Sequence, residues 1–150
     1  MKYLLSIAIL FASFNSFCQS KIKNDTLYKS VSLTKDDAGF LVLKAKAQNR
    51  IDEFIEAVNK YGKDVGNYRL VVKSDFVEND EHEHMWSQIV MYNNGVFAGV
   101  FIDSPFKLKK IKTGQKVSVK KSDIEDWIIY NSKNEKIAGY FSEEYLKAKE

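Results

Sequence analysis

The spacing of apolar residues changes once along the chain, and this change constrains the fold more than any other feature. Apolar residues first recur at intervals of three and four, which places them on one face of a helix. They are Ala47, Ile51, Phe54, Ile55, Val58 and Tyr61. From Tyr68 onward the period falls to two, which is typical of strands that bury one face. The sequence therefore predicts one helix followed by a run of short strands.

The ends of these elements carry their own signals. Thr34 can cap the start of the helix, and Gly62 can end it. Strands are predicted over residues 68–77, 84–92, 96–102, 116–119, 126–130 and 136–141. Between the second and third strands, Asn93-Asn94-Gly95 supplies the left-handed backbone of a tight hairpin, so these strands should be antiparallel neighbours. Ser142 can cap a short last helix over 143–150.

Together these elements predict an α+β protein. One long N-terminal helix should pack on a strongly twisted antiparallel sheet that could curl toward a barrel, with a short C-terminal helix after it. A chain of 150 residues has the size of one ordinary domain. We expect this single domain to span residues 34–150, after a lead-in over 19–33 in which residues 27–33 can form a short strand.

The first 18 residues have the pattern of an export signal. Lys2 supplies a positive start, residues 4–14 are mostly apolar, and the small residues Ser16 and Cys18 precede Gln19. We expect cleavage after Cys18 and a protein that is exported to the periplasm or the cell exterior. The apolar run is short for a bilayer span, so no stable membrane insertion is expected after cleavage.

A lipid anchor on Cys18 is the alternative. A lipoprotein signal places a small residue just before the cysteine and an aliphatic residue three before it, whereas this chain has Phe17 and Asn15 there. Cys18 is also the single cysteine of the chain. A protein that starts at Gln19 would therefore have neither disulfides nor thiol chemistry.

The net charge of +3 is too small to indicate nucleic acid as a partner. Residues 107–121 are locally basic, with seven lysines and no acidic residue. This run could attract an anionic surface. Phe106 is its only aromatic neighbour, so the stacking platform that binds single strands is absent. We interpret the run as the lysine-rich, solvated face of a strand and loop.

The segment Glu81-His82-Glu83-His84-Met85-Trp86 contains both histidines of the chain. If it is a strand, His82, His84 and Trp86 share one face while Glu83 and Met85 share the other. Two histidines at this spacing can bind a metal, but a third ligand would have to be a carboxylate such as Asp126 or Asp103.

We therefore expect neither a metal nor another cofactor. A polar network is the favoured interpretation, in which a carboxylate and a backbone carbonyl satisfy the two nitrogens of His84. No serine lies in a Gly-x-Ser-x-Gly elbow, and no glycine-rich phosphate loop precedes a helix. No catalytic residue is assigned.

The segment 123–130 combines acidic and apolar residues. Strict alternation would place Ile124, Asp126 and Ile128 on one face and Glu125 and Trp127 on the other. A carboxylate on an apolar face needs a partner, and His84, Lys73 or a backbone donor could supply it to Asp126. Trp127 and Trp86 would be either core aromatics or the floor of a recognition groove.

Several short motifs occur in a recognisable order. They are Asp36-Asp37, the helical part 45–54, Glu83-His84-Met85-Trp86, Gly99 to Pro105, Lys112 to Val117, Ile124-Glu125-Asp126-Trp127 and Gly139-Tyr140. In this order the chain resembles the YegJ-like family of bacterial proteins, which is domain of unknown function 2314. The resemblance implies a small α+β domain without an assigned activity. It indicates one candidate functional surface: Glu83, His84, Trp86, Asp126, Trp127 and Tyr140.

Three hypotheses about function follow. The favoured one is an exported, non-catalytic binding module whose aromatic sheet face contacts an unknown protein, peptide or envelope glycan. The alternative is a hydrolase or metal-assisted enzyme that uses His84 with Asp126 or Glu83 as the orienting carboxylate. A third is an immunity-like protein that neutralises a partner. An enzyme is therefore less expected than a binding protein.

Overall fold

The computed structural model of the chain describes residues 38–143 and 145. Its helices are α1 (Ala38–Asn49) and α2 (Ile51–Tyr61). Its strands are β1 (Arg69–Glu78), β2 (Glu81–Asn93), β3 (Val96–Phe101), β4 (Lys116–Lys120), β5 (Ile124–Tyr130) and β6 (Lys136–Gly139), with the 3-10 helix η1 (Lys121–Asp123) before β5. In this part of the chain, no helix has both the length and the apolar character to cross a membrane.

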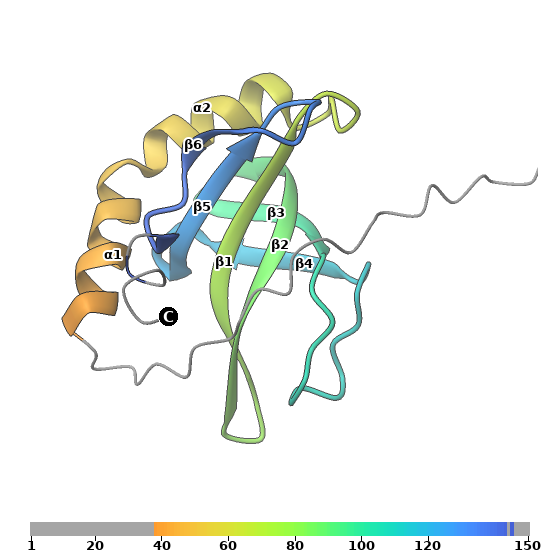
Figure 1. Cartoon of the computed structure of the whole chain (residues 1–150). Helices are drawn as coiled ribbons and strands as arrows, with labels where there is room; N and C mark the ends of the chain where they lie inside the picture. Colours follow the sequence, from red (N-terminus) through yellow and green to blue (C-terminus); the bar gives the residue numbers. More distant parts are fainter. Residues whose placement is uncertain (1–37, 144, 146–150) are drawn as a thin grey trace, which may run out of the picture. The chain divides into compact units, whose positions relative to one another are not determined.

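Four predicted features lie outside the described residues. They are the export signal over 1–18, the strand over 27–33, the helix cap at Thr34 and nearly all of the C-terminal helix over 143–150. The α+β class is confirmed, because two helices near the start of the described part pack on one face of an antiparallel sheet (Figure 1).

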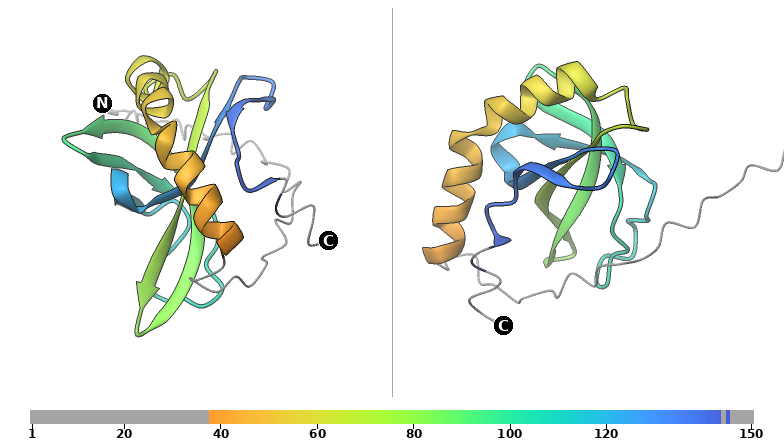
Figure 2. Two further views of the ribbon diagram at one scale, coloured as in Figure 1. Left: turned by 90° about the vertical axis from the view of Figure 1, so that its left-hand side faces the viewer. Right: turned by 45° about the horizontal axis from the view of Figure 1, so that its top comes forward.

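The six strands form one sheet in the order β4-β3-β2-β1-β5-β6, and every neighbouring pair is antiparallel. The predicted approach to a barrel is wrong, because β4 and β6 remain as the two edges of the sheet. These edge strands have five and four residues, so each offers few backbone groups to another strand. The sheet is therefore open and twisted, and the helices follow its curvature (Figure 2).

The predicted single helix is in fact two helices, which meet at Arg50. Arg50 has φ −112° and ψ 13°, outside the helical region. Its guanidinium donates to the carboxylate of Glu53 at 2.6 and 2.7 Å and lies over the rings of Trp127 and Phe141. The break changes the direction of the chain, so that both helices can bury a face against a twisted sheet.

Two hairpins build the centre of the sheet. The predicted turn between β2 and β3 is confirmed, with Asn94 at φ 47° and Gly95 at φ 81°. A second two-residue turn joins β1 to β2, with Asn79 at φ 51° and Asp80 at φ 65°. The sequence pattern does not predict this turn, because it places the start of the second strand at His84, whereas β2 begins at Glu81. Asn and Asp adopt left-handed backbone more readily than most residues.

Apolar side chains form a cluster on each face of the sheet. The larger cluster lies between the sheet and the helices and includes Phe54, Met85, Phe97 and Trp127. The smaller cluster lies on the opposite face. It consists of Val71, Trp86, Ile128 and Tyr130, with Ile102 and Tyr140 packed against it.

A substitution at Gly99 tests how closely β3 approaches β2 at the bulge in β2. A Cβ at Gly99 would lie 1.8 Å from the backbone oxygen of Gln88, so Gly99→Ala should lower the free energy of unfolding by about 2–3 kcal/mol. Gly66→Ala is the matched control, because a Cβ there has no neighbour within 4 Å. Its stability should stay within about 0.5 kcal/mol of the parent. Urea denaturation checks both, and equal effects would contradict the close approach.

Candidate functional site

The candidate site begins on the long hairpin formed by β1 and β2, which extends beyond the neighbouring strands (Figure 1). In the register of these strands Asp75 lies opposite His84, so their side chains share a face. His82 and Trp86 follow the alternation to the same face. Met85 lies in the cluster under the helices and Trp86 in the cluster on the opposite face. The predicted alternation of this strand is therefore confirmed.

His84 is paired with a carboxylate from another strand. Its Nδ1 lies 2.6 Å from Oε2 of Glu125, on β5. The Glu125 side chain is only 4% exposed, whereas that of His84 is 25% exposed. Phe40 of α1 packs edge-to-face against the imidazole, with ring centroids 5.5 Å apart. These contacts from β5 and α1 fix the orientation of the ring while leaving part of it accessible.

His82 forms a similar pair within the hairpin. Its Nδ1 lies 2.7 Å from Oδ2 of Asp75, and both side chains are partly exposed. Asp75 and Glu125 thus each hold one imidazole of the His-x-His pair. Neither carboxylate belongs to the predicted surface.

A bulge in the sheet explains why Glu125 reaches His84. Lys73 pairs with Asp126, but the next residue, Ser74, pairs with Ile124, so Glu125 is an extra residue on β5. Alternation therefore breaks at this point. Ile124 lies in the cluster under the helices, and the prediction that it shares a face with Asp126 is wrong.

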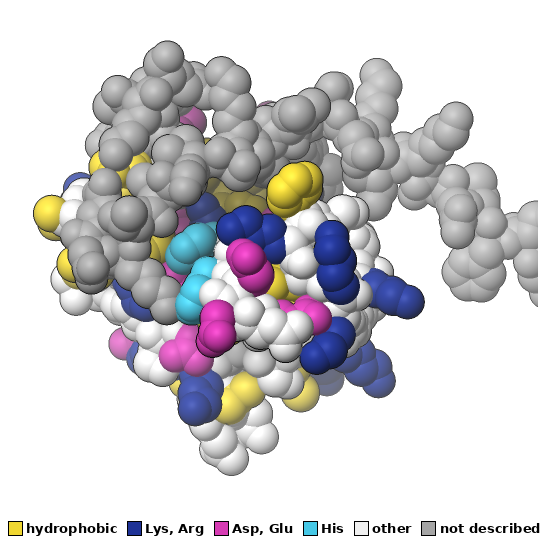
Figure 3. Space-filling view, turned by 90° about the horizontal axis from the view of Figure 1, so that it is seen from below, with side chains coloured by type: hydrophobic (Ala, Val, Ile, Leu, Met, Phe, Trp, Pro, Cys, Tyr) yellow, Lys and Arg dark blue, Asp and Glu magenta, His cyan; other side chains and the backbone are white. Residues whose placement is uncertain are grey.

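The His84–Glu125 pair opens into a cavity of about 350 Å³. The cavity combines apolar side chains from α1 with charged groups from the sheet and from η1. Its described lining residues are Phe40, Leu41, Lys44, Asp75, His84, Asp123 and Glu125. In Figure 3 the histidine side chains lie beside carboxylates on this face of the molecule. The lining thus contains three carboxylates and one ammonium group.

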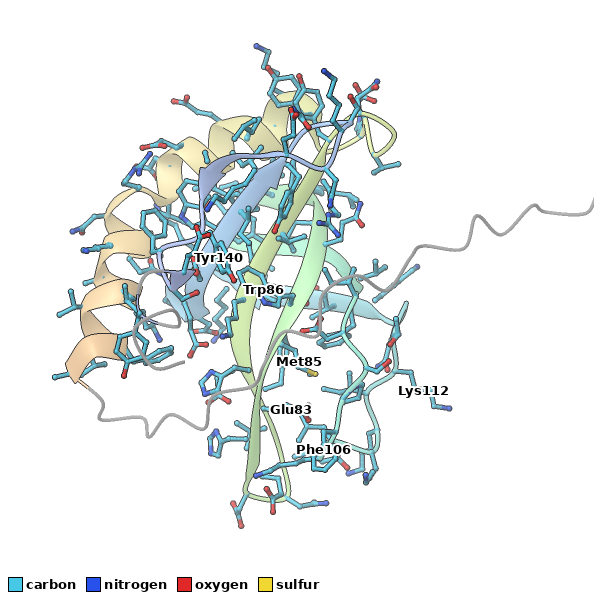
Figure 4. The ribbon with its side chains drawn as sticks, viewed as in Figure 1. Glu83, Met85, Trp86, Phe106, Lys112 and Tyr140 are labelled. Carbon is cyan, nitrogen blue, oxygen red and sulfur yellow. The ribbon has the colours of Figure 1, made fainter. Side chains whose placement is uncertain are left out.

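Glu83 points to the other face and holds the loop between β3 and β4. Its carboxylate accepts hydrogen bonds from the backbone N–H groups of Phe106, Lys107 and Leu108 at 2.7, 2.9 and 3.3 Å. Figure 4 shows Glu83 and Phe106 close together. Burial by itself raises the pKa of Glu83, but the three donors and the charge of Lys107 outweigh it. The pKa is therefore lowered.

Asp126 is 2% exposed and is bound by donors near the end of β6. It accepts from the N–H groups of Trp127, Phe141 and Ser142 at 2.8, 3.0 and 3.0 Å, and from Oγ of Ser142 at 2.5 Å. Burial raises the pKa of Asp126 against the opposing effect of these donors. The sequence predicts His84, Lys73 or a backbone donor as the partner of Asp126. Of these, the structure shows backbone donors. The carboxylate beside His84 is Glu125.

The aromatic members of the predicted surface lie in two places. Trp127 is completely buried and Trp86 is 6% exposed. Tyr140 packs against Trp86 with ring centroids 6.3 Å apart, within the smaller cluster, and Figure 4 labels both. Tyr140 has φ 66°, a strained conformation for a bulky residue. The structure therefore joins Trp86 with Tyr140, and Asp126 with the backbone of Trp127, but joins neither pair to His84.

Most residues around the cavity could not be predicted from the sequence. Glu125 lies beside Asp126 in a pair of acidic residues, and only the bulge decides which one faces His84. Phe40, Leu41 and Lys44 come from the first turns of α1, where burial is sparse and the pattern is weak. Within residues 38–143 and 145, His, Cys, Asp and Glu side chains nowhere form a group of three or more suited to a metal ion.

Comparisons with known proteins confirm the family resemblance. The family described as "Uncharacterized protein conserved in bacteria (DUF2314)" matches residues 42–149. The chain is also 31% identical to "Uncharacterized protein YegJ" of Escherichia coli (strain K12) over 141 residues, which cover 94% of this chain and 84% of that protein. No solved structure matches the chain. The matched region includes the cavity lining except Phe40 and Leu41.

The role of Glu83 predicts a pH-dependent loss of stability on substitution. Glu83→Gln should lower the free energy of unfolding by about 1–2 kcal/mol near neutral pH, because a neutral amide accepts more weakly from three N–H groups. The folded state lowers the pKa of Glu83 from its ordinary value of 4.5. The stabilisation is therefore present above that value and disappears as the pH falls through the folded pKa.

Urea denaturation at a series of pH values measures this difference. The gap between the parent and Glu83→Gln should narrow below a pH of about 4.5. Glu56→Gln, at an exposed position on α2, is the matched control and should show little effect at any pH. A gap that stayed constant on acidification would contradict the assigned role.

Proposed function

The chain belongs to the DUF2314 family, and we propose that this member is an exported, non-catalytic binding module whose cavity accepts a basic segment of a partner protein. The observation that carries this proposal is the composition of the cavity wall. Three carboxylates and one lysine line it, together with two apolar side chains from α1. The lining therefore combines acidic groups with an apolar surface.

The proposed ligand follows from this chemistry. A Lys or Arg side chain has an apolar stem and a charged head. Its stem can contact Phe40 and Leu41, of which Leu41 is 51% exposed. Its head can approach the carboxylates of Asp123 and Glu125 in the same lining. The two tryptophans are buried and are therefore not part of the proposed surface.

The export that this proposal assumes rests on the sequence of residues 1–18. A positive start, an apolar run and small residues before Gln19 are the features that support it. The immunity-like role is a special case of the same proposal, because it also needs a surface that binds one partner. The genes beside this one would distinguish the two.

One observation favours the enzyme as the second candidate. A histidine whose Nδ1 is bound by a buried carboxylate, beside an open cavity, is the arrangement of many general bases. The distance of 2.6 Å between His84 and Glu125 fits it. However, the described lining residues include no Ser, Thr, Cys or Tyr. A nucleophile would have to be water or a group from elsewhere.

Peptide binding tests the first proposal. The chain from Gln19 is titrated into fluorescent octapeptides that contain Arg or Lys beside an aromatic residue, and into acidic peptides of the same length. Basic peptides should bind preferentially. Leu41→Ser and Asp123→Asn, at exposed lining positions, should each weaken binding by about threefold. Glu125→Gln should weaken it further, because Glu125 also orients His84.

Glu56→Gln is the charge-matched control and should leave peptide affinity unchanged, since it lies on α2 away from the lining residues. Equal binding of acidic and basic peptides would sink the proposal. A panel of ester, amide and phosphoester substrates distinguishes the enzyme from the binding module. Turnover that is lost in His84→Gln but kept in His82→Gln would replace the binding module with a hydrolase.

A further inference from the structure

A second surface lies outside the cavity, on the loop over residues 102–115 that joins β3 to β4. Phe106 on this loop is 80% exposed, the most exposed large hydrophobic side chain among the described residues. Burial normally stabilises a phenyl ring, so a largely solvated one in a defined loop needs a reason.

The loop holds this ring outward through a built structure. Glu83 binds three consecutive backbone N–H groups, beginning with that of Phe106. Leu108, two residues on, is 1% exposed and anchors the loop in the core. Thr113 Oγ1 donates to the carbonyl of Asp103 at 2.9 Å. The exposure of Phe106 is therefore a consequence of fixed backbone, and the ring has no place in the core.

Lysines follow Phe106 along the chain, and only part of their charge is matched. Lys107 pairs with Glu81 at 3.0 Å, and Lys110 lies 3.9 Å from Glu78. Among residues 38–143 and 145, no ion pair involves Lys109, Lys112 or Lys116. Figure 3 shows Lys and Arg side chains gathered on one side of the face, and Lys112 points away from the sheet (Figure 4).

We propose that this loop docks the protein on anionic phospholipid bilayers, with Phe106 in the interfacial region and Lys109, Lys112 and Lys116 against the headgroup phosphates. Basic side chains are attracted to an anionic leaflet, and an apolar side chain among them adds affinity by leaving water. A hydrated polyanion would match the lysines but offers no apolar medium for the ring. A single aromatic side chain also lacks the stacking partners that nucleic-acid strands need.

The contact is peripheral and reversible, because one ring and three ammonium groups fall short of stable anchoring. It differs from insertion of a helix and does not depend on what the cavity binds. The charge that drives it is local, since the chain as a whole carries only +3. Binding should therefore weaken steeply with salt.

Vesicle flotation tests the proposal with the chain from Gln19, because the apolar run over 4–14 would bind any bilayer. Vesicles of phosphatidylcholine with phosphatidylglycerol are compared with vesicles of phosphatidylcholine alone. Partitioning to the anionic vesicles should be at least about tenfold stronger, and high salt should abolish the difference.

Variants then separate the contributions of the ring and the lysines. Phe106→Ser and the triple variant K109Q/K112Q/K116Q should each lower partitioning by about tenfold or more. The charge-matched control K46Q/K63Q/K133Q, at exposed positions elsewhere, should keep it within about twofold. Val65→Ser is the apolar control, since Val65 is 57% exposed on another loop. Circular dichroism confirms that each variant is folded.

Phe106→Trp supplies a readout that a merely structural role would not produce. Its partitioning should persist, and its fluorescence should shift to the blue with anionic vesicles only. Absence of partitioning to anionic vesicles would overturn the proposal. A second result would also overturn it: partitioning that survives Phe106→Ser, together with no blue shift in Phe106→Trp. The surface would then bind polyanions in general. An equal loss in the control triple variant would also overturn it.

Discussion

The burial of Trp127 is the constraint on which the arrangement of the other elements depends. Its ring is completely buried and lies 5.5 Å from that of Phe54 on α2. Its indole N–H donates to the carbonyl of Ala47 in α1 at 3.0 Å, and its own carbonyl accepts from Tyr140 at 2.8 Å. A Cβ at Gly139 would lie 2.6 Å from its ring. One side chain therefore ties both helices to β5 and requires glycine at the end of β6.

This anchor has a consequence for the site. Trp127 must face the helices, yet Ile124, three residues earlier, is buried on the same side. An odd separation cannot keep two residues of a regular strand on one face. The bulge opposite Lys73 and Ser74 resolves the conflict by adding one residue. That residue is Glu125, and its side chain reaches His84. The His84–Glu125 pair thus follows from the packing of a core that takes no part in the cavity.

Part of this structure could be predicted from the sequence and part could not. Local patterns predicted the α+β class, the hairpin at Asn94 and Gly95 and the alternation around His84, because each depends on neighbours within a few residues. The helix break at Arg50 and the choice of Glu125 over Asp126 depend on how distant strands twist and pair. No glycine or proline marks the break, and adjacent carboxylates are indistinguishable until a register is known. The His-x-His motif could therefore be predicted from the sequence, whereas its partner Glu125 could not.

The hairpin of β1 and β2 also decides how charge is distributed beside the cavity. Glu83 could have neutralised a lysine, but it is bound by three backbone N–H groups of the loop instead. A carboxylate that is satisfied by backbone dipoles fixes the loop without forming short ion pairs with its ammonium groups. On the opposite face of the sheet, Asp75 and Glu125 each bind an imidazole. Acidic and basic surfaces therefore coexist a few residues apart in a chain whose net charge is small, because hydrogen bonds to imidazoles or to backbone N–H groups hold each of these carboxylates in place.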